Sequence, residues 1–321
     1  MSKMAIFSAR WGHTREMIQA WMAAIRVKTL LIPTIQVMTC VSLASRFTEK
    51  LSWGIALGAW FVSVLITIGT NLINDVIDFE KGGDSVNPLG QLKVIRLRLL
   101  SKRSVKAAGF GAFIAACLIA WMLPVSNAVF FLVLLSCVCG YCYTGGPYPI
   151  SYNGLSEVFI LLFYGGVCIL TGFYVLTGMI NASSFLLAFQ MGCLAILPNA
   201  LNNYRDFKAD RAVNKKTLAV RFGLNFAQRE IGFLIIFPFL INLLWLQTGF
   251  PLAALLPLCL LPLVVLFLRQ ATKPLPLYSQ TEYSGQDIMI LRTYYNKLFA
   301  LGIAVHFLFG IALVLAFLLS W

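Results

Sequence analysis

Charged residues are scarce in this chain of 321 residues. Asp, Glu, Lys and Arg together make up 12% of it, whereas soluble domains carry about 25%. Hydrophobic residues make up 60%, against about 45–50% in a soluble domain. This balance excludes an ordinary soluble domain, a disordered chain and a small disulfide-stapled domain. The class that remains is a polytopic membrane protein.

Histidine is rarer still, with two residues, and the eight cysteines lie almost wholly in apolar runs. The densest group, Cys137, Cys139 and Cys142, has no neighbouring histidine or second cysteine pair. We therefore expect these cysteines to pack a membrane helix and not to form a zinc or redox site. Residues 1–20 lack the apolar core and cleavage site of a signal peptide. We expect a cytoplasmic segment there, with room for a short interfacial helix.

Nine apolar stretches are each close to the roughly 20 residues that a helix needs to cross a bilayer. The sequence therefore predicts an all-α membrane protein, with about nine transmembrane helices in a single domain over residues 1–321. The segment 270–296 is expected to be a long loop. The nine predicted spans are 22–45, 51–78, 104–123, 126–143, 154–177, 182–205, 227–247, 250–269 and 297–319.

Lysine and arginine outnumber Asp and Glu by 25 to 12, and they are concentrated in alternate loops. Of the 25 basic residues, 23 fall on one predicted side of the membrane, and only Arg46 and Lys50 fall on the other. The positive-inside rule then places the N-terminus in the cytoplasm and the C-terminus outside. Because the basic residues lie between apolar runs, the excess positive charge indicates membrane topology and no binding of nucleic acid.

A polar pattern, N-x-x-N-(D/N)-x-x-D, occurs twice in the same register, 128 residues apart. Positions i, i+3, i+4 and i+7 share one face of a helix, so each copy forms a polar stripe. Four predicted helices separate the copies, so both stripes reach the cytoplasmic face. A carboxylate at this depth costs about 2.5–3.5 kcal/mol, which favours a functional role. The stripes consist of Asn71, Asn74, Asp75 and Asp78 in the first copy, and Asn199, Asn202, Asn203, Asp206 and Asp210 in the second.

Clustered carboxylate and amide oxygens suit a hard cation such as Mg²⁺ or Ca²⁺. Mg²⁺ is typically held by a few carboxylates together with substrate phosphates, and basic side chains can bind the same phosphates. The sequence therefore predicts a metal–diphosphate site at the mouth of an apolar bundle, for a substrate with a long lipid tail. A transporter with repeated cation sites is the remote alternative. The basic candidates are Lys81 and Lys93 beside the first stripe, and Arg205, Lys208, Arg211, Lys215 and Lys216 beside the second.

The two stripes resemble the two aspartate-rich motifs of the UbiA superfamily of intramembrane prenyltransferases. The similarity extends over about residues 20–230. Three stretches most resemble the members that prenylate 1,4-dihydroxy-2-naphthoate. They are Arg26-Val-Lys-Thr-Leu30, Tyr143-Thr-Gly-Gly-Pro-Tyr-Pro-Ile150 followed by Gly154-Leu-Ser-Glu157, and Leu201 through Gly223.

This resemblance implies Mg²⁺-dependent transfer of a long isoprenyl chain from an allylic diphosphate to 1,4-dihydroxy-2-naphthoate, with loss of CO₂. The reaction would belong to menaquinone synthesis in a bacterial inner membrane, with lipid around the protein. Other acceptors, 1,4-dihydroxy-6-naphthoate or 4-hydroxybenzoate, remain alternatives.

The resemblance also implies roles for individual residues. Asp75, Asp78, Asp206 and Asp210 would be the catalytic metal–diphosphate residues, and Asp84 a further metal ligand. The substrate-binding residues would be Asn71, Asn74, Asn202 and Asn203 in the motifs, Lys28, Arg205, Lys208 and Lys215 as cations, and Tyr143, Tyr148, Tyr152 and Glu157 around the acceptor.

Overall fold

The computed structural model of the chain describes residues 16–82, 87, 89–90, 94–272 and 284–319. These residues contain helices and no strand, which confirms the predicted all-α class. Eight helices are long and apolar enough to cross a membrane, and α6 is a shorter apolar helix of 16 residues. All nine predicted spans therefore correspond to apolar helices, although their boundaries shift.

Residues 16–25 form a first short helix. The remaining elements are η1 (Val27–Leu30), α2 (Leu31–Ala44), α3 (Trp53–Glu80), α5 (Lys102–Met122), α6 (Asn127–Cys142), η2 (Ser151–Asn153), α7 (Ser156–Ile160), η3 (Leu161–Thr171), α8 (Gly172–Thr177), α9 (Ala182–Arg205), α10 (Phe207–Ala212), α11 (Leu218–Phe222), α12 (Leu224–Leu240), η4 (Ile241–Thr248), η5 (Leu252–Leu260), α13 (Leu261–Ala271) and α14 (Gly285–Leu319).

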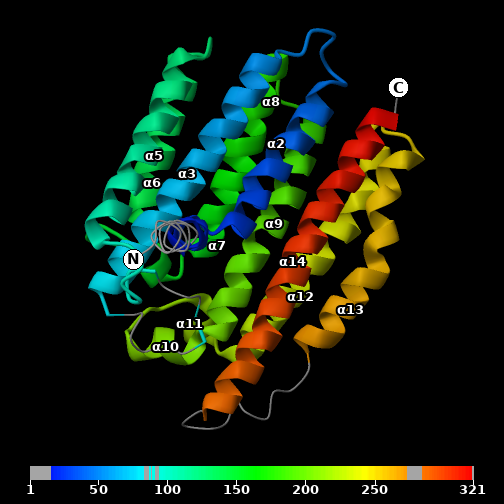
Figure 1. Ribbon diagram of the computed structural model, residues 1–321. Coiled ribbons are helices and arrows are strands. Elements are labelled where there is room, and N and C mark those ends of the chain that lie inside the picture. Colours follow the sequence, from blue (N-terminus) through cyan, green and yellow to red (C-terminus); the bar gives the residue numbers. More distant parts are fainter. Residues whose placement is uncertain (1–15, 83–86, 88, 91–93, 273–283, 320–321) are drawn as a thin grey trace, which may run out of the picture.

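The long helices run side by side in one bundle, and the short helices α10 and α11 lie at one end of it (Figure 1). Helix α9 is the central element, because it packs against α2, η3, α12 and α14 and is the most buried of the spans. The C-terminal end of α14 lies at the opposite end of the bundle from α10 and α11 (Figure 1).

Local sequence explains where several helices begin. The side chain of Ser52 accepts a hydrogen bond from the backbone of Ile55 at the start of α3, and Asn181 forms a capping box with Ser184 at the start of α9. Such side chains satisfy backbone N–H groups that the helix itself leaves unpaired. Gly165 lets η3 approach α9 closely, since a Cβ atom there would collide with the Ala188 carbonyl.

The span Ser156–Thr177 is continuous, but its middle part, η3, is wound as a π-helix. Residues of this span that line the cavity described below come in adjacent pairs, repeated every four residues. An α-helix repeats every 3.6 residues, so a wider winding helps to keep the pairs on one face. The pairs are Phe159 and Ile160, Phe163 and Tyr164, Val167 and Cys168, Thr171 and Gly172, and Val175 and Leu176; Ser156 lines the cavity singly at the start of the span.

The predicted span 22–45 is wrong as a single helix, because the chain breaks at Arg26. Arg26 has φ 56° and ψ 59°, a left-handed conformation that ends the helix of residues 16–25. This conformation costs a non-glycine residue about 1–2 kcal/mol. Its side chain forms an ion pair with Asp75 on α3, which offsets that cost. Hydropathy alone cannot show a break of this kind.

The predicted loop 270–296 is also partly wrong, since α14 begins at Gly285 and not at 297. Ser284 and Asp287 form a reciprocal cap there: the Ser284 backbone donates to Asp287 Oδ2 at 2.9 Å, and the Asp287 backbone donates to Ser284 Oγ at 3.2 Å. The Ser-x-x-Asp spacing is the signal that could have located this helix start. Residues 273–283 lie outside the described part of the chain.

Candidate functional site

A cavity of about 750 Å³ opens into the bundle between α2, α3, α6, η3 and α9. Asn74 and Asp78 of α3 line its polar end, whereas Ala59 and Ile55 of the same helix line its apolar end. At 1.5 Å per residue, the stretch of α3 between Asp78 and Ile55 is about 35 Å long. The cavity therefore joins a polar site near one face of the bundle to an apolar tunnel that extends through most of it.

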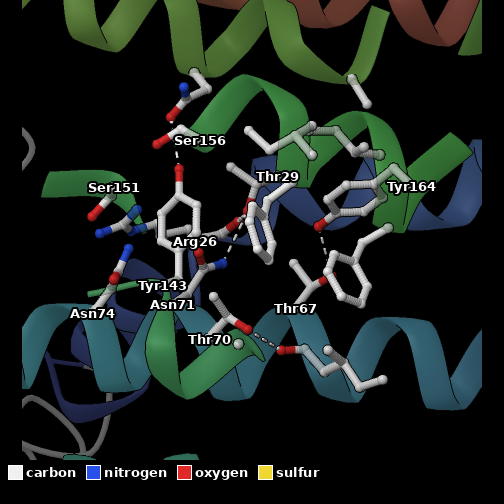
Figure 2. Close-up of a pocket in the computed structure, with 18 of the residues that line it drawn as sticks. Arg26, Thr29, Thr67, Thr70, Asn71, Asn74, Tyr143, Ser151, Ser156 and Tyr164 are labelled. Carbon is white, nitrogen blue, oxygen red and sulfur yellow. Dashed lines mark hydrogen bonds between the residues drawn. The ribbon is translucent and has the colours of Figure 1, made fainter. Parts of the chain in front are cut away.

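The first stripe is tied to the N-terminal helix and the turn that follows it. Arg26 donates to Asp75 Oδ1 at 2.7 Å, and the Asp75 side chain is 5% exposed. The Asn71 amide donates to the Ile25 carbonyl at 3.2 Å and to Thr29 Oγ1 at 3.1 Å. Figure 2 shows Arg26, Thr29, Asn71 and nearby Asn74 on the same side of the cavity. The break at Arg26 thus helps to shape the site.

Asp78, the last member of the first stripe, lies beside a tyrosine and a lysine. The Tyr152 hydroxyl donates to Asp78 Oδ1 at 3.3 Å, and the Lys81 ammonium lies 4.0 Å from the centre of the Tyr152 ring. Lys81 also donates to the Thr144 carbonyl at 2.8 Å. The loop between α6 and α7 is therefore fixed against the end of α3.

The second stripe carries its own cations. Arg205 binds Asp206 with two nitrogens, at 2.6 Å and 2.7 Å, and the Lys215 ammonium lies 3.4 Å from Asp210 Oδ1. Lys215 also interacts electrostatically with Asp78 of the first stripe. Asp78 of the first motif and Asp210 and Lys215 of the second line the same cavity, so side chains of both motifs lie at one polar end.

Burial and neighbouring charges shift the two carboxylates of this stripe in opposite directions. Burial is the main cause that raises the pKa of Asp210; Lys215 opposes this shift, Asp206 adds to it, and the net pKa is about 6. Burial acts in the same sense on Asp206, but the Arg205 guanidinium outweighs it and holds the pKa of Asp206 below its usual range. A further positive charge beside Asp210 would favour its ionised form.

The oxygens that face this site fit a hard cation. Among the described residues, Asn74 Oδ1, Asn202 Oδ1 and Asp210 Oδ2 are buried acceptors without a hydrogen-bond donor. No group of three Asp, Glu, His or Cys side chains in the described part of the chain forms a complete metal cage. Mg²⁺ needs no such cage, because it commonly combines one or two carboxylates with substrate phosphates and water. The donor set therefore fits Mg²⁺ bound together with a diphosphate.

A buried glutamate lies behind the second stripe. Glu157 Oε1 accepts from the Asn199 amide at 3.0 Å and from the Asn203 amide at 2.9 Å. The Tyr143 hydroxyl in turn donates to Asn199 Oδ1 at 3.0 Å. Ser156 is a second hydrogen-bonding partner of Tyr143 (Figure 2).

Several predicted site residues do not line the cavity, unlike Asp78, Asp206 and Asp210 of the two motifs. Asp75 and Glu157 contact the site through Arg26 and the asparagines but are not themselves among the described lining residues. Lys208 also lies outside that lining. Lys28 and Tyr148 are exposed, Tyr148 to 63%, and do not line the cavity either. Asp84 lies outside the described residues.

The structure also adds lining residues that the sequence did not single out. Arg96 and Leu97 line the cavity from the loop before α5, and Ile288 and Arg292 line it from α14. Asn87 lines it too and forms a side-chain hydrogen bond with Asp206. These residues lie outside both motifs, so only the tertiary fold brings them to the site.

Comparison with known proteins points to the same family that the two motifs resemble. The model of the UbiA prenyltransferase family matches residues 35–277. The 1,4-dihydroxy-2-naphthoate octaprenyltransferase of Bacillus subtilis is 31% identical over 180 residues, which cover 55% of this chain and 58% of that protein. The enzyme of the same name from Escherichia coli is 30% identical over 216 residues, which cover 64% of this chain and 69% of that protein.

Solved structures show the same fold at low sequence identity. A UbiA homolog from Archaeoglobus fulgidus, bound to DMAPP and Mg²⁺, has a TM-score of 0.58 and is 14% identical, covering 92% of this chain and 98% of that chain. A UbiA homolog from Aeropyrum pernix K1 has a TM-score of 0.60 and is 13% identical, covering 91% and 98%.

Proposed function

Since this chain belongs to the UbiA prenyltransferase family, we propose that it transfers a long isoprenyl chain from an allylic diphosphate to 1,4-dihydroxy-2-naphthoate. The product would be the demethylmenaquinol precursor of menaquinone, formed with loss of CO₂. The relatives named above support this acceptor, because they carry that name and share about 30% identity with the chain. The relative solved with DMAPP and Mg²⁺ supports the diphosphate and the metal.

One observation carries the proposal. Both polar stripes converge at one end of a cavity whose remainder is an apolar tunnel. A molecule with a diphosphate head and a hydrocarbon tail matches both parts at once. A cation transporter needs no such tunnel, so this geometry favours the transferase.

The residues of the site suggest how the reaction proceeds. Mg²⁺, when bound, would neutralise charge that builds on the leaving diphosphate. Lys215, which lines the polar end of the cavity, would add positive charge around the diphosphate, and Lys81 would add charge from beside Tyr152. The bond between the allylic carbon and the diphosphate oxygen breaks, and the diphosphate keeps the electron pair. The apolar walls, including Phe159 and Phe163, would keep water from the resulting allylic cation.

The acceptor ring then supplies the electrons for the new carbon–carbon bond. Attack comes from the ring carbon that bears the carboxyl group, and that group leaves as CO₂, returning its bonding electron pair to the ring. Tyr143, Ser156 and Thr70 present hydroxyl groups to the cavity near the polar end and could orient the acceptor's hydroxyls (Figure 2).

The topology of the chain belongs to the same proposal. The motif ends, α10 and α11 lie at one end of the bundle, and the C-terminal end of α14 lies at the other (Figure 1). We place the motif end in the cytoplasm, because the basic residues gather there. The proposed membrane is a bacterial inner membrane, where a water-soluble acceptor would reach the site from the cytoplasm.

Because the tunnel is this deep, filling its far end should lower turnover with long donors and spare turnover with short ones. Ala59 lies about 29 Å along α3 from Asp78, on the cavity face. Replacing Ala59 with tryptophan is expected to lower turnover with octaprenyl diphosphate at least tenfold and to leave turnover with geranyl diphosphate within twofold. The measurement is product formation with each donor.

Leu57 offers a matched control for this variant, since it lies on the same helix but is 56% exposed and outside the cavity lining. Leu57→Trp should leave both donors unaffected. If Ala59→Trp lowered turnover equally with the short and the long donor, while Leu57→Trp lowered neither, the donor's tail would lie outside this part of the tunnel.

The acceptor is tested with a panel. Purified protein in lipid is given octaprenyl diphosphate and Mg²⁺ with 1,4-dihydroxy-2-naphthoate, its 6-carboxy isomer or 4-hydroxybenzoate in parallel. We expect a prenylated, decarboxylated product from the first acceptor and at least tenfold less from the others. Preference for either of the other two would correct the acceptor while leaving the transferase assignment in place.

A further inference from the structure

Glu157 contacts the second motif from behind. It is 8% exposed, and one of its oxygens accepts from the amides of both Asn199 and Asn203. Its other oxygen, Oε2, is buried without a hydrogen-bond partner in the described part of the chain. A buried carboxylate that is only partly satisfied costs stability, so its place between two motif asparagines calls for a functional reason.

The chemistry of these hydrogen bonds fixes the direction of the asparagine side chains. Both asparagines turn their NH₂ groups toward Glu157, because Oε1 of that side chain accepts a hydrogen bond from each of them. Each amide oxygen then points away from Glu157. The oxygen of Asn199 accepts from Tyr143, and Asn203 lines the cavity beside Asn202, whose own Oδ1 is a buried acceptor without a donor.

We propose that Glu157 is a positioning residue of the cation site: by holding the NH₂ groups of Asn199 and Asn203, it keeps the Asn203 oxygen directed to the metal–diphosphate end of the cavity. This inference rests on the proposed function, because it assumes that the motif oxygens bind a cation. It assigns Glu157 a role different from the acceptor contact expected from the sequence. Groups that orient metal-binding side chains commonly affect metal affinity 10–100-fold when they are replaced.

The test measures metal binding apart from turnover. Mn²⁺ is titrated into purified protein in the presence of inorganic pyrophosphate, and bound Mn²⁺ is followed by electron paramagnetic resonance. Glu157→Gln keeps the size of the side chain but adds an NH₂ group that competes with the asparagine amides. We expect it to weaken Mn²⁺ binding about 10–100-fold, with little change in the metal-free unfolding midpoint.

Glu230 on α12 provides the matched control. It lies close enough to Glu157 for electrostatic interaction, yet it forms no hydrogen bond with either asparagine in the described structure. Glu230→Gln removes a neighbouring carboxylate without touching the amides, and it should bind Mn²⁺ as the unmodified protein does. An equal loss in Glu230→Gln would show a general charge effect and overturn the positioning role.

A double-mutant cycle tests whether Glu157 acts through Asn203. If it does, Glu157→Gln should have less than a threefold effect on Mn²⁺ binding once Asn203 is alanine. Full additivity of the two substitutions, or unchanged binding in Glu157→Gln alone, would overturn the inference and leave the proposed function intact. Absence of Mn²⁺ binding in the unmodified protein would instead refute the metal site itself.

Discussion

Replacing Asp206 with asparagine is expected to lower turnover at least about 100-fold, the scale on which electrostatic stabilisation of a reacting group is usually lost. Asp206 lies at the polar end of the cavity and is ionised, since Arg205 holds its pKa below the usual range. Asparagine keeps the shape of the side chain and removes the charge that a cation would bind. The measurement is steady-state turnover at saturating donor and Mg²⁺.

The control for Asp206→Asn is Glu49→Gln, which neutralises an exposed carboxylate in the loop between α2 and α3. That loop joins the helix ends remote from the motif end, so turnover should stay within twofold. Glu49→Gln should retain the unfolding temperature of the unmodified protein. Asp206→Asn also breaks the buried ion pair with Arg205, so its turnover is measured at a temperature where its unfolding curve shows it folded. Turnover of Asp206→Asn close to that of Glu49→Gln would remove Asp206 from the reaction.

Removing Arg26 is expected to destabilise the protein by about 3–5 kcal/mol, because it breaks the ion pair between Arg26 and the buried Asp75 carboxylate. The side chains of Arg26 and Asp75 are 18% and 5% exposed, so solvent screens them weakly. Arg26→Met should therefore lower the free energy of unfolding strongly, whereas the double variant with Asp75→Asn should recover much of the loss. Chemical denaturation in detergent measures both.

An exposed ion pair supplies the comparison. Lys102 and Glu80 lie 3.1 Å apart, with side chains 48% and 42% exposed. Such surface pairs contribute about 0–1 kcal/mol, so Lys102→Met should change the free energy of unfolding little. If Lys102→Met and Arg26→Met lowered the free energy of unfolding by similar amounts, burial would not strengthen the contribution of the Arg26–Asp75 pair.

The ion pair also changes how Asp75 variants are interpreted. From the motifs alone, Asp75→Asn and Asp206→Asn are both expected to leave folding and membrane insertion intact and to remove most turnover. In the structure Asp75→Asn also leaves Arg26 without its hydrogen-bonded partner. A loss of activity in Asp75→Asn therefore combines two effects, and the same holds for Asp206→Asn, which removes the carboxylate that Arg205 binds with two nitrogens.

The helices and the repeated motif were accessible from sequence because both depend on local pattern. The predicted span 182–205 coincides with α9, since its apolar run begins after the Asn181 cap and ends at the second motif. The stripes of Asn and Asp follow from helical spacing, so their convergence at one end of the bundle was predictable from the parity of the helices between them.

Long-range contacts account for what the sequence could not show. The left-handed turn at Arg26 is compensated by Asp75 on another helix, and no pattern around residue 26 reveals this partner. The same holds for Arg96 and Arg292, which reach the cavity from segments outside both motifs. The early start of α14 is different, because the Ser284–Asp287 cap is a local sequence signal for it. The predicted span began later because it followed hydropathy and not this cap.

The central claim is a metal-dependent prenyl transfer at the two motifs. The most direct measurement follows the release of diphosphate and the prenylated product together, with octaprenyl diphosphate and 1,4-dihydroxy-2-naphthoate as substrates. Our account predicts equal amounts of both products with Mg²⁺, none with EDTA, and recovery when Mg²⁺ is restored. Undiminished transfer in EDTA, or no transfer by folded protein in Mg²⁺ with any aromatic acceptor, would contradict it.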